Sequence, residues 1–166
     1  IDLCCGTGCL GISLLKEFKS SNCDFIDISN QALLNCNKNI SSLSVENRSN
    51  IFQSDLFENY PISKIKYVKF IVCNPPYIPT ENFYLLDNET LHDPKISLDG
   101  GSGGLDFYIR IIEFLKNQQF TGDVYFEIDP LIVVKFDKFL LEKDIKIVYK
   151  KQDYLNLDRL LKITFP

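Results

Sequence analysis

The stretch that decides the fold is Ile1-Asp2-Leu3-Cys4-Cys5-Gly6-Thr7-Gly8-Cys9-Leu10-Gly11. An apolar run ends at Cys4, and glycines at positions 6, 8 and 11 follow it directly. Glycines in this GxGxxG spacing let the backbone turn tightly and approach a ligand at the N-terminus of a helix. The stretch therefore predicts the end of a strand, a glycine-rich turn and the start of a helix.

Outward from this turn, apolar strand-like runs alternate with helical patterns. We expect strands at 1–4, 23–28, 51–52, 67–73, 124–128, 145–149 and 160–165. The helical patterns between them lie at 10–18, 32–36, 105–112 and 132–140, and Ser29 is the expected N-cap of the second helix. Such strand–helix repeats predict a mostly parallel sheet with helices on both faces, and the last two strands should pair antiparallel.

The stretch 78–104 shows no sustained periodicity. It contains Pro79, Pro94 and four glycines between positions 100 and 104. Its apolar residues, which suggest that it packs, are Leu85, Leu86, Leu91, Ile96 and Leu98. A loop of this length in a compact domain is usually functional or disordered, so we interpret it as an ordered loop on the substrate side.

Composition limits the class of protein. The chain has 166 residues, 45% of them hydrophobic, and 18 Lys+Arg against 22 Asp+Glu give a net charge of −4. This length predicts one domain, and we expect neither a membrane span nor an intact secretory signal. The mild acidity speaks against stable nucleic-acid binding. Because the chain begins at Ile1 and contains no Met, we interpret it as a fragment.

The six cysteines predict no metal site. Several lie within apolar runs, and no pair has the CxxC spacing of a zinc or thioredoxin site. Cysteines placed this way behave as small hydrophobic residues, so we expect reduced core thiols. Reduced thiols indicate an intracellular, reducing compartment, either the cytoplasm or a mitochondrial matrix.

Acidic residues at strand ends indicate a nucleotide site. Asp27 ends the second strand, where its carboxylate could accept hydrogen bonds from both ribose hydroxyls. Asp55 ends the third strand and could bind an exocyclic amine, with Leu56 and Phe57 beside the ring. Each residue alone could be a turn or helix-start carboxylate. These residues alone do not exclude NAD as the nucleotide.

Asn74-Pro75-Pro76-Tyr77 is the most specific motif, because it follows the apolar run 70–73 directly. The two prolines fix the backbone and remove two N–H donors, so the carbonyls and the Asn74 side chain can accept hydrogen bonds from outside. A planar NH2 group matches such a pair of acceptors, and Tyr77 supplies an aromatic ring beside it. The simpler alternative is a proline-rich turn.

These residues resemble class I S-adenosylmethionine-dependent methyltransferases that act on planar amide or exocyclic nitrogens. The chain is similar, in particular, to the HemK/PrmC-type release factor glutamine methyltransferases. The further residues that carry this similarity are Ile78-Pro79, Glu89, His92-Asp93-Pro94, Leu98-Asp99-Gly100-Gly101 and Gly104-Leu105-Asp106-Phe107-Tyr108. Three positions depart from the family pattern: Cys5, Leu56 and Asp129.

The resemblance implies a Rossmann-like fold, with a seven-stranded sheet and an antiparallel edge. We expect the protein to be a monomer. Residues 1–166 would be the catalytic domain, without the family's N-terminal helical domain. The enzyme would use S-adenosyl-L-methionine to methylate the glutamine of the GGQ motif in a peptide chain release factor. The implied cofactor residues are Asp2, Gly6, Thr7, Gly8, Asp27, Ile28, Asp55, Leu56, Phe57 and Asn74. The implied catalytic residues are Asn74, Pro75, Pro76 and Tyr77.

An amide nitrogen is a poor nucleophile, so we expect positioning to do most of the catalysis. The Asn74 side-chain carbonyl and the Pro75 carbonyl would accept the two amide hydrogens, and Tyr77 would wall the site. We interpret His92 as a structural hydrogen-bond partner rather than a base. The alternatives are an adenine-N6 methyltransferase on DNA or RNA, a silent S-adenosylmethionine-binding module and, more distantly, an NAD-linked oxidoreductase.

Overall fold

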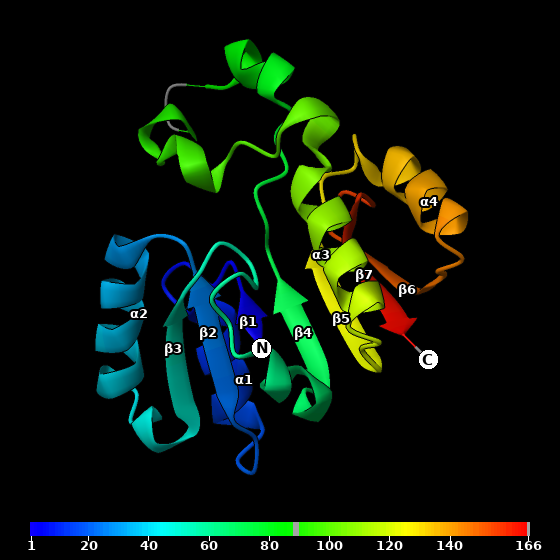
Figure 1. Ribbon diagram of the computed structural model, residues 1–166. Helices are drawn as coiled ribbons and strands as arrows, with labels where there is room; N and C mark the ends of the chain where they lie inside the picture. Colours follow the sequence, from blue (N-terminus) through cyan, green and yellow to red (C-terminus); the bar gives the residue numbers. More distant parts are fainter. Residues whose placement is uncertain (88–89, 166) are drawn as a thin grey trace. The chain divides into compact units, whose positions relative to one another are not determined.

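The computed structural model describes residues 1–87 and 90–165 (Figure 1). The chain forms two compact units, Ile1–Asn74 and Pro75–Pro166. Glu89, one of the residues that carry the family resemblance, lies outside the described residues. Across the described part of the chain, every helix is too short or too polar to cross a membrane.

The first unit is built on four parallel strands. These are β1 (Asp2–Leu3), β2 (Cys23–Asp27), β3 (Ser49–Gln53) and β4 (Phe70–Cys73), in the order β3-β2-β1-β4. In register, Leu3 lies opposite Ile26 on one side and Cys73 on the other. Because all four strands run the same way, the residues that follow their carboxyl ends meet at one edge of the sheet.

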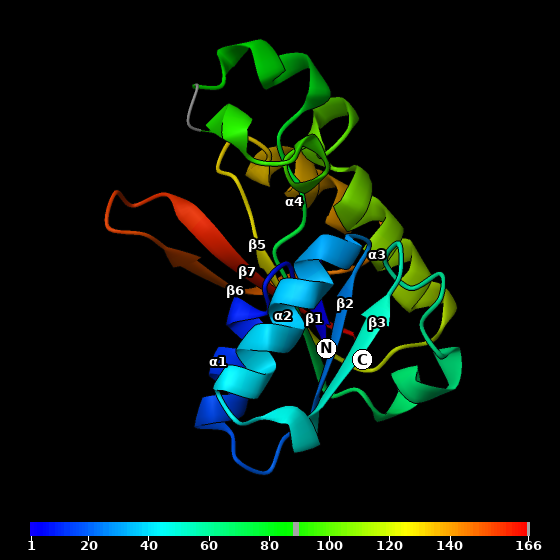
Figure 2. The same ribbon diagram turned by 90° about the vertical axis from the view of Figure 1, so that its left-hand side faces the viewer.

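Two helices pack side by side against these strands (Figure 2). Helix α2 (Asn30–Ser42) begins as predicted, with the Ser29 side chain accepting a hydrogen bond from the Ala32 amide at 3.2 Å. The shared core contains Cys5, Ile12, Leu15, Cys23, Phe25, Leu33, Cys36, Ile40 and Val45.

Helix α1 (Cys9–Glu17) corresponds to the predicted helical pattern at 10–18. The side chains of Leu10 and Phe18, at the two ends of that pattern, are 46% and 50% exposed. The buried face contains Gly11, Ile12 and Leu15. Gly11 sets which face is buried, because it lies so close to the strands that a Cβ there would stand 2.5 Å from the Phe25 ring.

Strand β4 is shorter than predicted. The apolar run 67–73 was expected to be one strand, but a 3₁₀ helix occupies Ile62–Tyr67 and the strand begins at Phe70. The Val68 amide donates to the Ile65 carbonyl and so closes the helix at 3.1 Å. This turn leaves Tyr67 72% exposed, outside the sheet.

The second unit contains α3 (Asp106–Asn117), β5 (Gly122–Glu127), α4 (Val133–Glu142), β6 (Ile147–Gln152) and β7 (Asp158–Phe165). Strand β7 pairs antiparallel with both β5 and β6, which confirms the predicted antiparallel pairing of the last two strands. Rings from both helices pack on β5: the Tyr108 centroid lies 5.2 Å from that of Phe126 and 4.9 Å from that of Phe136.

The strands follow the order β3-β2-β1-β4-β5-β7-β6, which is a seven-stranded mixed sheet with an antiparallel edge. This confirms the predicted Rossmann-like α/β fold.

The stretch 78–104 forms short 3₁₀ helices at Thr80–Leu85, Thr90–His92, Lys95–Ser97 and Ser102–Gly104. Ile78 and Asp99 join its two ends through a parallel bridge. The expectation that its apolar residues pack was wrong for Leu85 and Ile96, whose side chains are 66% and 52% exposed. The Leu91 side chain lies outside the described part of the structure.

Candidate functional site

The glycine turn, Gly6 to Gly8, leaves room for a ligand. Gly6 has a φ of +54° and Gly8 a φ of +81°, a left-handed conformation that favours glycine. A Cβ built on Gly6 would have no atom within 4 Å, whereas one on Gly8 would stand 2.6 Å from Cys36 Sγ. Gly8 is therefore a packing residue, while Gly6 forms an open cradle at the start of α1 that a nucleotide fits.

Asp2 ties this turn to the sheet. Its Oδ2 accepts a hydrogen bond from the Gly11 amide at 2.8 Å, and the residue is only 1% exposed. Burial raises the Asp2 pKa to about 7, although the Gly11 amide opposes the shift. Its Oδ1 is buried without a hydrogen-bond partner among the described residues. The structure thus gives Asp2 a positioning task, and its direct contact with a cofactor stays a prediction.

Asp27 is held in place by two backbone amides. Its Oδ2 accepts from Gly6 at 2.8 Å and its Oδ1 accepts from Ser29 at 2.9 Å. A carboxylate offers about four acceptor sites, so lone pairs remain for two hydroxyl donors. Ile28, the next residue, is 44% exposed and offers an apolar surface beside this carboxylate. This geometry is compatible with the predicted ribose contact.

Asn39 is a residue of this site that the sequence patterns did not reveal. It lies on α2, and its Nδ2 donates to the carbonyl of the exposed Thr7 at 3.0 Å. The bond joins the second helix to the glycine turn across 32 residues of sequence. No local motif marks such a contact.

Asp55 follows β3 and is half-buried. Leu56, the next residue, adopts a φ of +49° and is 7% exposed, and Phe57 is 4% exposed. The Phe57 ring lies edge-on to Tyr60, with centroids 6.3 Å apart. Phe57 is therefore buried against Tyr60, and contact of either apolar side chain with an adenine stays a prediction.

Asn74 is exposed directly after β4. Because Leu3 lies opposite Cys73, Asn74 stands at the same edge of the sheet as the start of the glycine turn. The first unit therefore brings together four strand ends that carry, in spatial order, Asp55, Asp27, the turn and Asn74. This is the edge at which open α/β sheets bind ligands.

In the second unit, Pro75 and Pro76 are buried and Tyr77 is half-buried. Burial raises the Tyr77 pKa, and the negative charges of Glu127 and Asp129 raise it further, against an opposing effect of Arg159. Tyr77 therefore remains a neutral phenol at neutral pH.

Sequence reasoning did not assign Glu127 to the site, although Glu127 ends β5 as Asp27 ends β2. The strand-end rule used for Asp27 would have found it. Arg159 lies on β7, with its guanidinium 3.8 Å from Asp129 and 3.1 Å from Asp153.

The cysteines and His92 are not among the residues of the candidate site. Among the described residues, no group of His, Cys, Asp and Glu is arranged to hold a metal ion. All six thiols are free, but Cys9 is exposed and Cys4 half-buried, so the expectation of core thiols was wrong for these two. His92 is exposed in a 3₁₀ helix.

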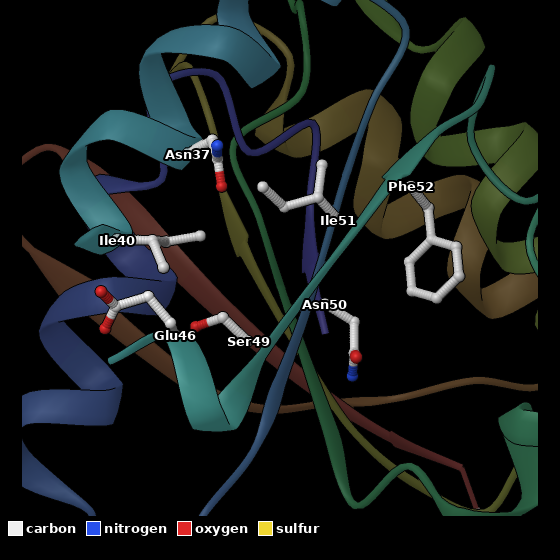
Figure 3. Close-up of a pocket in the computed structure, with 7 residues that line it drawn as sticks. All are labelled: Asn37, Ile40, Glu46, Ser49, Asn50, Ile51 and Phe52. Atoms are coloured by element: carbon white, nitrogen blue, oxygen red, sulfur yellow. The ribbon is translucent and has the colours of Figure 1, made fainter. Parts of the chain in front are cut away.

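A groove of about 440 Å³ lies between α2 and β3. Figure 3 shows the side chains that line it. They belong to Asn37, Ile40, Glu46, Ser49, Asn50, Ile51 and Phe52. None of these is a predicted site residue, and most lie toward the amino end of β3, away from the edge that carries Asp27 and Asp55.

The model of the family described as methyltransferase small domain matches residues 1–101. The ribosomal protein uL3 glutamine methyltransferase of Francisella tularensis is 38% identical over 112 residues, which are 68% of this chain and 35% of that protein. The enzyme of the same name from Neisseria meningitidis is 36% identical over 112 residues, 68% of this chain and 36% of its own length. The chain thus spans about one third of these relatives.

Solved structures share the fold. The METTL16 methyltransferase domain aligns with a TM-score of 0.71 at 14% identity, covering 99% of this chain and 59% of that one. A ribosomal protein L11 methylase from Lactobacillus delbrueckii aligns with a TM-score of 0.62 at 21% identity, covering 99% and 67%. At these identities the likeness shows the fold alone.

Proposed function

Because the chain belongs to the methyltransferase small domain family, we propose that it methylates the side-chain amide nitrogen of a glutamine with S-adenosyl-L-methionine as the donor. The observation that carries this proposal is the exposed Asn74 at the carboxyl edge of the parallel strands, in line with Asp27, Asp55 and the open turn at Gly6. Such a transfer needs a hydrogen-bond acceptor for the substrate amide and a binding site for the nucleotide part of the cofactor at the same edge of the sheet.

The cofactor, when bound, supplies an electrophilic methyl group on a sulfonium. Gly6 leaves space for it, Asp27 offers fixed acceptors for its ribose hydroxyls, and Ile28 offers apolar surface for its base. Asp27 needs no rearrangement for this task, since two backbone amides already orient the carboxylate.

The Asn74 side-chain carbonyl and the Pro75 carbonyl accept the two hydrogens of the substrate amide. In these positions they would favour the build-up of positive charge on the substrate nitrogen and aim it at the methyl group that the cofactor would supply. The nitrogen then loses one proton to solvent, which restores a neutral amide. Orientation of this kind contributes up to roughly 7–11 kcal/mol in favourable models.

The favoured substrate is ribosomal protein uL3, because the relatives with 34–38% identity are named uL3 glutamine methyltransferases. A peptide chain release factor is the second candidate, supported by the resemblance of Leu98-Asp99-Gly100-Gly101 and Gly104-Leu105-Asp106-Phe107-Tyr108 to the release factor enzymes. Both substrates present a glutamine amide, so the chemistry at Asn74 is the same.

Methyl transfer from labelled S-adenosylmethionine tests the proposal. The purified protein is incubated separately with uL3, with a release factor and with duplex DNA, and mass spectrometry locates the added methyl group. We expect label on one glutamine nitrogen of uL3 and none after that glutamine is replaced by alanine.

Label on the release factor alone would show that the release factor is the substrate, and the proposed glutamine methylation would stand. Label on DNA adenine, or cofactor binding without transfer to any of the three, would contradict the proposal.

A further inference from the structure

Two glycines of the second cluster, Gly100 and Gly104, pack against protein main chain, whereas the space around Gly6 is open. A Cβ on Gly100 would stand 2.7 Å from Tyr77 Cα and 2.8 Å from its carbonyl carbon. A Cβ on Gly104 would overlap the Tyr77 carbonyl oxygen. Two glycines thus touch the main chain of the same residue, and only glycine permits either approach.

Backbone hydrogen bonds lock this contact. The Ile78 amide donates to the Leu98 carbonyl at 3.0 Å, and the Gly100 amide donates to the Ile78 carbonyl at 2.8 Å. The Thr80 amide donates to the Gly101 carbonyl at 3.0 Å. Residues 98–104, which we call the glycine brace, therefore hold the chain that follows Tyr77 as a neighbouring strand would.

Side chains strengthen the glycine brace. The Thr80 hydroxyl donates to Asp99 Oδ1 at 2.6 Å, and the same oxygen accepts from the Gly101 amide at 3.1 Å. The Gly103 amide donates to Glu81 Oε1 at 3.1 Å. These bonds join the segment at residues 80–81 to the segment at residues 99–103.

We infer that the glycine brace is a positioning element for methyl transfer. Gly100 and Gly104 fix the main chain of Tyr77, and this keeps the Tyr77 ring in the orientation that the substrate glutamine needs. The inference rests on the proposed function. The inference assigns a role to the segments 98–101 and 104–108, which the motif Asn74-Pro75-Pro76-Tyr77 alone does not explain.

The surroundings of the Tyr77 side chain agree with a fixed ring. The half-buried phenol is close enough to the charges of Glu127, Asp129 and Arg159 for them to shift its pKa, and Glu127 also interacts with it by a side-chain hydrogen bond. Because the Tyr77 pKa is raised by this burial and by the two carboxylates, it reports whether the ring keeps its place. A ring that moved into solvent would titrate closer to the ordinary value of 10.0.

Two neighbouring glycines provide a matched test. Gly103 and Gly104 have similar backbone angles, with φ of +68° and +77°, so alanine strains both alike. A Cβ on Gly103, however, would meet only Lys135 Nζ at 3.5 Å. We compare Gly104→Ala and Gly100→Ala with Gly103→Ala in the purified protein. For each, kcat, KM, cofactor affinity and the Tyr77 titration by NMR with labelled tyrosine are measured.

We expect Gly100→Ala and Gly104→Ala to lower kcat at least about 10-fold, because misplacement by about 1 Å can cost about 100-fold in rate. Cofactor affinity should stay within about 2-fold, since the cradle at Gly6 lies in the first unit. The Tyr77 pKa should fall in both variants. Gly103→Ala, whose Cβ would meet only Lys135 Nζ, should lower kcat and shift the titration less than either of them.

An unchanged Tyr77 titration in Gly100→Ala and Gly104→Ala, or equal rate losses in all three variants, would overturn the inference. If Gly104→Ala does not fold, Thr80→Val removes the hydroxyl bond to Asp99 without adding a clash, and it should shift the titration in the same direction. Failure of the wild type to methylate any glutamine would count against the proposed function, and the Tyr77 titration would still decide whether the brace holds the ring.

Discussion

The two glycine clusters of this chain are alike in sequence and different in use. Around Gly6, space is open where a Cβ would stand, whereas at Gly100 and Gly104 that space is filled by the main chain of Tyr77. In both clusters a glycine amide donates to a carboxylate, Gly6 to Asp27 and Gly101 to Asp99. A glycine-rich motif therefore indicates close approach, and only the structure tells whether a ligand or the protein itself makes it.

The first cluster should be the more sensitive to pH, through Asp2. Its pKa is raised by burial from 3.8 to about 7, so the folded state binds the proton more tightly than the unfolded state. The resulting stability is full below the unfolded pKa and is lost as pH rises through 7. At most it amounts to roughly 4 kcal/mol.

Urea unfolding of the wild type and of Asp2→Asn at about pH 5 and pH 8 checks this expectation. The wild type should lose stability relative to the variant at the higher pH, because asparagine does not titrate. Parallel pH dependences would show that Asp2 is charged at little cost and would weaken its role in holding Gly11.

The next largest effect concerns Asp27. Replacement by alanine removes the charged acceptor that also orients Gly6, so we expect cofactor binding to weaken by about 1.5–3 kcal/mol, roughly 10-fold to more than 100-fold. Glu17→Ala, which removes an exposed carboxylate at the end of α1, is the matched control. Calorimetry that finds the same affinity in Asp27→Ala and the control would remove Asp27 from the site.

The smallest effect is expected at Glu127, in the second unit. Glu127→Gln keeps an acceptor but removes the charge, so the Tyr77 pKa should fall only in part, since burial is the larger cause. NMR titration measures the shift, and cofactor affinity should not change. Glu142→Gln, an exposed glutamate on α4, is the control. A Tyr77 titration that Glu127→Gln leaves untouched would contradict the described surroundings of the ring.

Much of the first unit could be predicted because its features are local. The alternation of strand and helix patterns predicts the strands. The placement of Asp27, Asp55 and Asn74 at or just after strand ends then follows from the rule that parallel strands share a carboxyl edge. The Ser29 cap was visible for the same reason: its bond to Ala32 spans three residues.

Features that depend on tertiary contacts could not be predicted. The buried face of α1 is set by the approach of Gly11 to Phe25, which spacing alone does not show. The bond from Asn39 to Thr7 and the packing of Gly100 on Tyr77 join residues more than 20 positions apart. The glycines between positions 100 and 104 indicate an irregular stretch, but the sequence does not show that Gly100 and Gly104 pack on Tyr77.

The most direct test of the central claim is the single-turnover rate of glutamine methylation by Asn74→Ala, measured together with its cofactor affinity. Loss of one positioned hydrogen-bonding group at a reacting centre typically costs about 10²–10³ in rate. We expect a loss of this size with cofactor affinity within a few fold, and no loss in Asn37→Ala, an exposed asparagine on α2 outside the site. Retained turnover in Asn74→Ala would contradict the account, because the acceptor amide would then be held by other groups.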